Sequence, residues 1–445
     1  MPQLSPRRPF DPARWPFFYG WVVLAVGTVG IVASVPGQTT GISVFTDHLL
    51  EATGLTRLQL TNAYLFGTLV SGLLLPFGGR WLDAVGARVM GPIAALGMAL
   101  SLAALSSADR LVAFAGSLTA ATVPSAVVGV GVLSVLFGGL RFTGQGLLTL
   151  TSRTMIARWF DRYRGLIGAT SGAVIGFTFS LAPMVFLGWI ERADWQGAWR
   201  QMALLLLVFA AVAVVFFRET PEESGLEMDG GTGRDEDGST GSASRRKEPA
   251  WTRSEALATS EFWLITVAVS LQSMLGTGIT FHIVDLGREA GIEAARFVRI
   301  MVPVSFFSIV TGFLMGYLVD RVRALHIVRV SLLGQLVLYL AAANVSVEWA
   351  RVAMVAGWGI AAGCYGPLTV AAPARLFGRA HLGSISGVLS MVLVLASAVG
   401  PVFLSVLQGV NGLYRTGFFV AALLPLLTFF ATWIVPASAQ KRAPR

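Results

Sequence analysis

A short charged stretch, Gly79-Arg80-Trp81-Leu82-Asp83-Ala84-Val85-Gly86-Ala87-Arg88, separates two long uncharged apolar runs. It returns 237 residues later as Gly316-Tyr317-Leu318-Val319-Asp320-Arg321, with the glycine and the aspartate at the same spacing. A repeat of this kind predicts a chain built from two related halves. In a membrane protein, related halves are typical of a carrier whose binding site lies between them.

The repeat extends beyond the charged stretch. The segment 41–49 resembles 278–286, again 237 residues apart, whereas 157–162 resembles 374–379 at a distance of 217 residues. The shorter distance predicts extra residues in the first half, between Asp83 and Arg158. The stretch 108–124 fits that place and length, so we expect an external insertion there, in the form of a short amphipathic segment.

The composition indicates a membrane protein. Of the 445 residues, 54% are hydrophobic and 13% are charged, and the mean hydropathy is +0.69, whereas soluble domains carry roughly 25% charged residues. An apolar run of about 20 residues spans a bilayer and must be helical there. The uncharged runs that meet this length are 18–46, 58–79, 89–107, 125–152, 165–190, 201–217, 262–286, 300–319, 328–347, 352–374, 382–409 and 414–435.

We therefore predict an all-α membrane protein with twelve transmembrane helices, arranged as two six-helix bundles related by a pseudo-twofold axis. The predicted domains are an N-terminal bundle, 1–217, and a C-terminal bundle, 261–445. The segment between them, 218–260, is rich in Gly, Ser and charged residues in its middle. This composition is typical of a flexible linker.

The positive charges predict the orientation of the chain. If the N-terminus is cytoplasmic, 23 of the 33 Lys and Arg residues fall in inner loops and termini, as the positive-inside rule requires. We expect a multi-pass protein of the cell (inner or plasma) membrane, with the linker and both termini in the cytoplasm. The first span is too long for a signal-peptide core and lacks a cleavage site, so we expect it to be retained.

Several classes of function are disfavoured by the residue content. Cys364 is the only cysteine, and the four histidines lack zinc-site spacing, so we expect no metal site. Lys247 and Lys441 are the only lysines, which excludes a Gly-Lys-Ser/Thr phosphate loop. The net charge of +9 does not lie on a face with aromatic residues, so we expect no nucleic-acid partner. We expect neither an enzyme nor a bound cofactor.

Arg141 is the most informative single residue. It lies near the middle of the fourth apolar run, in Leu140-Arg-Phe-Thr-Gly-Gln-Gly146, where an arginine costs at least ~2.5–3.5 kcal/mol. It must therefore face the bundle interior or a wet cavity. Two interpretations stay open: an anion-binding or coupling group, or a structural arginine that donates hydrogen bonds to carbonyls of the first helix.

Other polar residues within the apolar runs are candidates for substrate binding or coupling. His282 and Asp285 lie on one helix face, so this pair could accept a proton, or both could be wet interfacial residues. Gln38 follows Pro36-Gly37, a pair that can break a spanning helix. The remaining candidates are Tyr64, Gln145 and Gln272. For Gln38 and for each of these three, a hydrogen bond between helices is at least as good an interpretation.

The repeated charged stretch resembles the loop signature of the major facilitator superfamily, between helices 2 and 3 and again between helices 8 and 9. The resemblance implies a conformational latch in which Asp83 caps a neighbouring helix and pairs with an arginine. In the second copy, Arg323 stands in the place of Gly86 and Leu325 in that of Arg88, so we expect weaker control there. The latch residues are Gly79, Asp83, Gly86, Arg88, Gly316, Asp320 and Arg321.

Four motifs resemble the monocarboxylate and oxalate/formate branch of this superfamily: Tyr19-Gly-Trp21, Pro36-Gly-Gln-Thr39, Arg141-Phe-Thr-Gly-Gln-Gly146 and Arg158-Trp-Phe-Asp-Arg162. The resemblance implies a small organic anion as substrate. That branch usually has an arginine in helix 8 that binds the carboxylate, but the corresponding stretch here, 308–316, has none. Carboxylate binding would then depend on Arg141 alone, or the substrate is not a carboxylate.

We thus expect a secondary active transporter that works by alternating access on a small, monocarboxylate-like organic anion coupled to protons. The alternatives are an antiporter or uniporter for a neutral or amphipathic solute, or a non-transporting membrane sensor with the same fold. The expected partners are a small-molecule substrate, protons and the lipid bilayer, and we expect the chain to be a monomer.

Overall fold

The computed structural model describes residues 8–119, 122–161, 163–230, 250–293, 297 and 299–434. The regular elements in this part of the chain are all helical, which confirms the predicted all-α class. Within it, eleven helical segments are long and apolar enough to cross a membrane. One of them, α9 (Arg164–Phe216), contains two of the predicted spans, separated by non-helical backbone at Ala193 and Asp194. The eleven segments therefore account for the twelve predicted spans.

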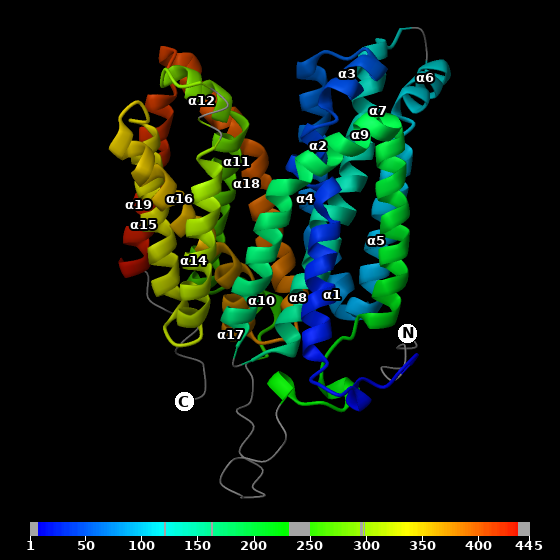
Figure 1. Cartoon of the computed structure of the whole chain (residues 1–445), viewed down its shortest axis with the longest axis vertical. Coiled ribbons are helices and arrows are strands. Elements are labelled where there is room, and N and C mark those ends of the chain that lie inside the picture. The colour runs from blue at the N-terminus through cyan, green and yellow to red at the C-terminus, as the bar shows by residue number, and fades with distance from the viewer. Residues whose placement is uncertain are drawn as a thin grey trace, which may run out of the picture. The chain divides into compact units, whose positions relative to one another are not determined.

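The helices of the first half follow the predicted runs closely (Figure 1). They are α1 (Gly20–Ala33), α2 (Thr39–Ser43), α3 (Thr46–Thr53), α4 (Arg57–Val85), α5 (Ala87–Leu105), α6 (Ala108–Leu118), α7 (Ser125–Arg141), α8 (Thr149–Trp159) and α9. A short 3-10 turn, η2 (Val35–Gly37), separates α1 from α2, and a π-helical segment, η3 (Phe142–Leu148), joins α7 to α8.

The second half has the same all-helical character. Its helices are α10 (Arg253–Leu257), α11 (Ser260–Phe281), α12 (Ile283–Glu289), α14 (Met301–Val319), α15 (Ala324–Ala342), α16 (Glu348–Gly366), α17 (Ala372–Phe377), α18 (Leu382–Asn411) and α19 (Tyr414–Ile434). A second π-helical segment, η6 (Pro367–Ala371), joins α16 to α17.

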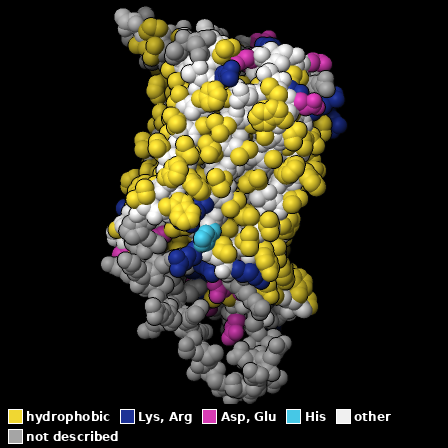
Figure 2. All heavy atoms as spheres, turned by 90° about the vertical axis from the view of Figure 1, so that its left-hand side faces the viewer, with side chains coloured by type: hydrophobic (Ala, Val, Ile, Leu, Met, Phe, Trp, Pro, Cys, Tyr) yellow, Lys and Arg dark blue, Asp and Glu magenta, His cyan; other side chains and the backbone are white. Residues whose placement is uncertain are grey.

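The outward faces of the helices are apolar. Val135, Leu204 and Val302 are 75%, 62% and 73% exposed, which is unfavourable in water but natural in lipid. Figure 2 shows one such face, where hydrophobic side chains cover the middle and charged side chains lie toward the two ends. This pattern explains how a chain with so few charged residues can be stable in a lipid bilayer.

The chain divides by its internal packing into two compact units. Unit 1 is Met1–Trp159 with Ile175–Gly231, and unit 2 is Phe160–Val174 with Thr232–Arg445. The beginning of α9 thus packs with unit 2: a Cβ atom at Gly165 would overlap the carbonyl oxygen of Gly316. The domain boundaries predicted from the sequence, 1–217 and 261–445, stay a prediction.

The charged stretches are more helical than the sequence suggested. We expected a turn from Gly79 to Arg88, but α4 continues to Val85, and Gly86 alone breaks the helix with a φ of 80°. In the second copy, α14 continues to Val319 and Asp320 is its C-cap. Between Arg80 and Val85 no Pro or Gly opposes helical geometry, so the charges mark where the helix leaves the apolar layer.

The segment 8–15, here called the N-terminal strap, packs on the ends of α1 and α9 in unit 1. Arg218 is 1% exposed and donates to the carbonyl oxygens of Val215 at 2.7 Å and Arg8 at 3.3 Å. Its guanidinium lies 4.9 Å from the ring centre of Phe10. The Tyr19 hydroxyl donates to Phe216 at 2.7 Å, and burial raises its pKa to about 12, so this bond persists at alkaline pH.

The predicted insertion is a helix, α6, which packs on α3 and α7 within unit 1 (Figure 1). Its Phe114 and Leu118 are 63% and 72% exposed. The middle of the predicted linker, 231–249, lies outside the described residues. Near its end, Thr252 and Glu255 form a capping box that begins α10, so that part of the predicted linker is helical.

Candidate functional site

Arg141 is buried in unit 1 at the end of α7, with 2% of its surface exposed. Its Nη1 atom donates to the hydroxyl of Tyr64 at 2.5 Å, and lies 3.4 Å from Thr39 Oγ1 and 3.5 Å from the carbonyl oxygen of Gly37. The Tyr64 and Thr39 hydroxyls are themselves 2.8 Å apart. Three segments, α4, η2–α2 and α7, thus meet at one guanidinium.

The guanidinium has no acidic partner. Among the residues that the structure describes, no Asp or Glu lies within ion-pair distance of Arg141, and its Nε atom is buried without a hydrogen bond. The Oε1 atom of Gln145, one turn further on, is also buried without a partner. Buried polar atoms in proteins are nearly always hydrogen-bonded, so these two atoms mark a place where a ligand or water is needed.

The break in the first span brings its backbone to Arg141. A Cβ atom at Gly37 would lie 2.9 Å from the Leu140 carbonyl oxygen and 3.3 Å from the Gln145 amide nitrogen, so only glycine allows this approach. The π-helical segment η3 begins directly after Arg141, and π-segments often occur at functional sites. The expectation that Pro36 and Gly37 interrupt the helix is therefore met by the structure.

Gln38 does not contact Arg141. Its Nε2 atom donates to Ser34 Oγ at 3.1 Å, and Thr149 Oγ1 donates to the same oxygen at 3.0 Å. Gln38 therefore takes part in a hydrogen-bond chain between the first span and α8. Sequence reasoning missed Ser34 and Thr149, because single hydroxyl residues in apolar runs give no pattern by which to choose them.

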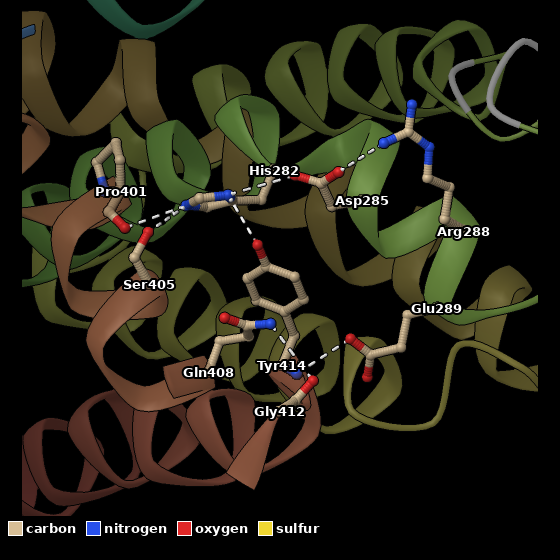
Figure 3. A network of polar contacts seen from close by, with 9 residues as sticks. All are labelled: His282, Asp285, Arg288, Glu289, Pro401, Ser405, Gln408, Gly412 and Tyr414. Atoms are coloured by element: carbon tan, nitrogen blue, oxygen red, sulfur yellow. Dashed lines mark hydrogen bonds and ion pairs between the residues drawn. The ribbon is translucent and has the colours of Figure 1, made fainter. Parts of the chain in front are cut away.

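His282 lies at the junction of α11 and α12 in unit 2, one residue past the candidate span Ser260–Phe281. It is 7% exposed. Its Nε2 atom lies 3.1 Å from both the Pro401 carbonyl oxygen and Ser405 Oγ, and its Nδ1 atom lies 3.0 Å from the Tyr414 hydroxyl (Figure 3). The ring therefore links α11 to α18 and α19.

Acidic and basic groups of α12 lie near this ring. Asp285 Oδ2 is 4.0 Å from His282 Nδ1, and Asp285 Oδ1 accepts from Arg288 at 3.3 Å. Glu289 accepts a hydrogen bond from the backbone of Tyr414 (Figure 3). We expected Asp285 within the span 262–286, but α11 ends at Phe281. Asp285 therefore belongs to the separate helix α12, and its side chain is 51% exposed.

Gln272, another predicted candidate, lies on α11, and its Oε1 atom is buried without a hydrogen-bond partner.

In unit 1, Asp83 accepts a hydrogen bond from Arg158 at 2.8 Å. Arg158 also pairs with Glu219, which accepts the amide of Ala87 at the start of α5, where the helix dipole favours an anion. At Gly86, a Cβ atom would lie 2.7 Å from Glu219 Oε2. Sequence reasoning chose Asp83 and Gly86 but not Glu219, whose role depends on contacts far apart in the chain.

Arg88 bonds elsewhere, to the carbonyl oxygens of Val214, at 3.2 Å, and of Arg8. It therefore joins α5 to the end of α9 and to the N-terminal strap. Gly79 lies within α4, so it takes no part in the break that Gly86 makes.

In unit 2, Asp320 Oδ2 accepts the amide of Gly165 at 3.0 Å, near the first residue of α9. Arg375, at the position that the repeat relates to Arg158, donates to the Val319 carbonyl oxygen. Arg321 donates to Tyr317 and lies 3.5 Å from the centre of its ring. Burial raises the pKa of the Asp320 carboxyl, and the Gly165 amide partly opposes this.

A family model for the Major Facilitator Superfamily matches residues 26–401 and, in a second match, 300–445. The chain belongs to the major facilitator superfamily. No curated protein matches it. As a member of the superfamily it is a membrane-embedded transporter of a small molecule, with the charged stretch present in two copies and Arg141 buried in unit 1.

Solved structures with this fold include other superfamily members. A proton:xylose symporter bound to 6-bromo-6-deoxy-D-glucose gives a TM-score of 0.69 at 16% identity, over 94% of this chain and 96% of that chain. The human organic anion transporter MFSD10 gives 0.63 at 16% identity, over 93% and 99%. The transporter FucP in an outward conformation gives 0.63 at 11% identity, over 94% and 100%. At these identities the likeness shows the major facilitator fold alone.

Proposed function

We propose that the protein is a secondary active transporter of a small, monocarboxylate-like organic anion, and that Arg141 binds the negative charge. The observation that carries this proposal is a guanidinium, 2% exposed within a spanning helix, that has no acidic partner among the described residues. A buried charge without a partner is strongly unfavourable, so its retention is explained best by an anion that arrives with the substrate.

The geometry of the guanidinium agrees with this role. Nη1 is used by Tyr64, whereas Nε has no hydrogen bond and Nη2 makes none to a described residue. The Nε and Nη2 groups form one edge of the guanidinium, with two parallel N–H bonds. A carboxylate accepts both bonds at once. Tyr64 orients the arginine from the opposite side.

We further propose protons as the coupling ion, with His282 as the group that binds them. Among the described residues, no Asp or Glu lies in the middle of a spanning helix, so a histidine at the end of α11 is the best-placed titratable group. The imidazolium form has acceptors at both nitrogens: Pro401 at Nε2, and Tyr414 and Asp285 at Nδ1. A protonated ring is thus compatible with the same contacts.

A neutral or amphipathic solute, carried by antiport or uniport, is the second candidate. It is favoured by the absence of an arginine from 308–316 in α14 and by the uncharged groups near Arg141, namely Tyr64 and Gln145. In that case Arg141 would be structural, as its hydrogen bond to Gly37 in the first span allows.

We also propose that the chain works as a monomer in the cell membrane, with both termini in the cytoplasm.

Uptake into proteoliposomes tests the proposal. Labelled lactate, pyruvate, oxalate and neutral amino acids are offered to the wild type and to Arg141→Gln, with and without a pH gradient. We expect anion uptake in the wild type and a loss of at least about tenfold in Arg141→Gln, since a hydrogen bond to a charged group contributes about 1.5–3 kcal/mol.

Arg200→Gln is the matched control, because Arg200 donates only to Ser106 Oγ among the described residues and does not contact Arg141. Equal anion uptake by wild type and Arg141→Gln would contradict the role of Arg141. Uptake of neutral solutes alone would favour the second candidate. Unchanged proton dependence in His282→Gln would remove His282 from the coupling.

A further inference from the structure

Four basic side chains lie at the start of α15 in unit 2. They are Arg321, Arg323, His326 and Arg329. Arg321, Arg323 and His326 are exposed, and within the described residues none of the four forms an ion pair. The nearest acid in sequence, Asp320, accepts the amide of Gly165 and interacts electrostatically with Arg321. Arg323, His326 and Arg329 therefore present positive charge without an ion-pair partner among the described residues.

Arg329 is held in one orientation by α19. Its Nε atom donates to Thr432 Oγ1 and its Nη2 atom to the Thr432 carbonyl oxygen, both at 2.9 Å. Its guanidinium carbon lies 3.9 Å from the ring centre of Trp433, which is 65% exposed. Nη1 makes no bond to a described residue, so the guanidinium is oriented in advance and still has donors for an anion.

An apolar surface begins directly beyond Arg329. Leu333, Val337 and Leu340 follow it at the spacing of one helix face and are 45%, 43% and 42% exposed. The neighbouring helix α19, which packs on α15, exposes Leu427 and Phe430 at 65% and 55%. The face in Figure 2 has a continuous hydrophobic area with basic side chains toward its ends.

We propose that the surface between α15 and α19 binds an anionic phospholipid. Its phosphate contacts Arg329, with Arg323 and His326 beside it, and an acyl chain lies along Leu333 and Val337. A free phosphate would use only the basic end. A zwitterionic lipid would bring its own cation toward the arginines. An anionic diacyl lipid such as phosphatidylglycerol matches both the charge and the apolar track.

Lipid titration of the purified full-length chain in detergent tests this site, with bound lipid counted by native mass spectrometry and the melting temperature recorded in parallel. We expect phosphatidylglycerol to bind and to raise the melting temperature more than phosphatidylcholine. Arg329→Gln should weaken phosphatidylglycerol binding about fivefold, since a basic residue near an anionic membrane surface contributes ≈ 1 kcal/mol.

Arg415→Gln is the matched control, because Arg415 also stacks on a ring of α19, 5.7 Å from the centre of Phe419, but at the other end of the helix. It should keep wild-type lipid binding. The exposed pair Arg323→Gln and His326→Gln repeats the test if Arg329→Gln does not fold.

Three results would each overturn the proposal. The first is equal binding of phosphatidylcholine, and the second is unchanged phosphatidylglycerol binding in Arg329→Gln or, where that variant does not fold, in the exposed pair. The third is displacement of the lipid by soluble glycerol phosphate at the same concentration, which would indicate a site for a free anion. None of these readouts requires transport activity, so the test of the lipid site does not depend on the role of Arg141.

Discussion

At the scale of single residues, Arg141 and Arg218 show two different uses of a buried arginine. Both are almost completely buried. Arg218 donates to carbonyl oxygens of Val215, Phe217 and Arg8 and lies against aromatic rings, so its hydrogen bonds stabilise the fold. Arg141 keeps Nε unbonded, which costs stability and leaves a donor for function.

This contrast predicts opposite effects of the same substitution. Arg141→Met should raise the free energy of unfolding by ~1 kcal/mol or more, because it removes an uncompensated charge, while the bond between Tyr64 and Thr39 remains. Arg218→Met should lower it by ~2 kcal/mol or more, because several carbonyl groups lose their donor. Thermal unfolding in detergent measures both variants, and a destabilised Arg141→Met would show that Arg141 is structural.

Asp320 gives a prediction about pH. Burial raises the pKa of its carboxyl, so the folded state holds this proton more tightly than the unfolded chain does. The stability that Asp320 contributes is therefore complete below the ordinary aspartate pKa of about 3.9 and is lost as the pH rises through the raised value.

Asp320→Asn should consequently be at least as stable as the wild type near neutral pH, and any advantage should vanish near pH 4. The asparagine can still accept the Gly165 amide. Melting curves across this pH range decide the matter: a variant that is less stable only at neutral pH would mean that the carboxylate charge stabilises the fold.

At the scale of elements, Gly86 makes the join between α4 and α5. Its φ is 80°, and a Cβ atom there would meet Glu219. Gly86→Ala should therefore destabilise the protein by about 1–3 kcal/mol. Gly131→Ala in α7, where an added Cβ meets nothing, should be neutral or stabilising by up to about 1 kcal/mol. Comparable melting temperatures for Gly86→Ala and Gly131→Ala would mean that a side chain at position 86 does not strain the connection between α4 and α5.

The elements were also the part of the structure that sequence predicted best. Uncharged runs located the spans because lipid leaves the backbone no alternative to a helix, and Pro36 with Gly37 located the break after α1. The predicted end of α4 was wrong, because charged residues mark the membrane surface and do not by themselves end a helix. The helix ends at Gly86, which has a positive φ.

The contacts of the candidate site were less predictable. Arg141 was found from its cost in lipid. Tyr64 was chosen separately as one of several polar candidates and does contact the arginine, but Gln38 bonds to Ser34 instead. The direction in which a side chain leaves its helix decides which partner it contacts. A shift of one residue changes that direction, and the composition of the sequence does not specify it. Glu219 was missed for a similar reason, since its partners Ala87 and Arg158 are distant in sequence.

At the scale of the whole molecule, the predicted topology places the linker and both termini on one side of the membrane. Cys364 is the only cysteine and is fully buried, so a single introduced cysteine is a clean reporter. Cysteines placed at Ser239 and at Ala443 should react with an impermeant maleimide from the same side, and one at Ser117 in α6 from the opposite side. Labelling of Ser239 and Ala443 from different sides would contradict an even number of spans.

The N-terminal strap has a consequence for how this sequence can change. Arg88 and Arg218 both reach it through the main-chain oxygen of Arg8, not through that residue's side chain. Any amino acid at position 8 supplies the same oxygen. Substitutions at position 8 should therefore be tolerated, whereas deletion of the strap should not. A purification tag should be added ahead of the strap and should not replace it.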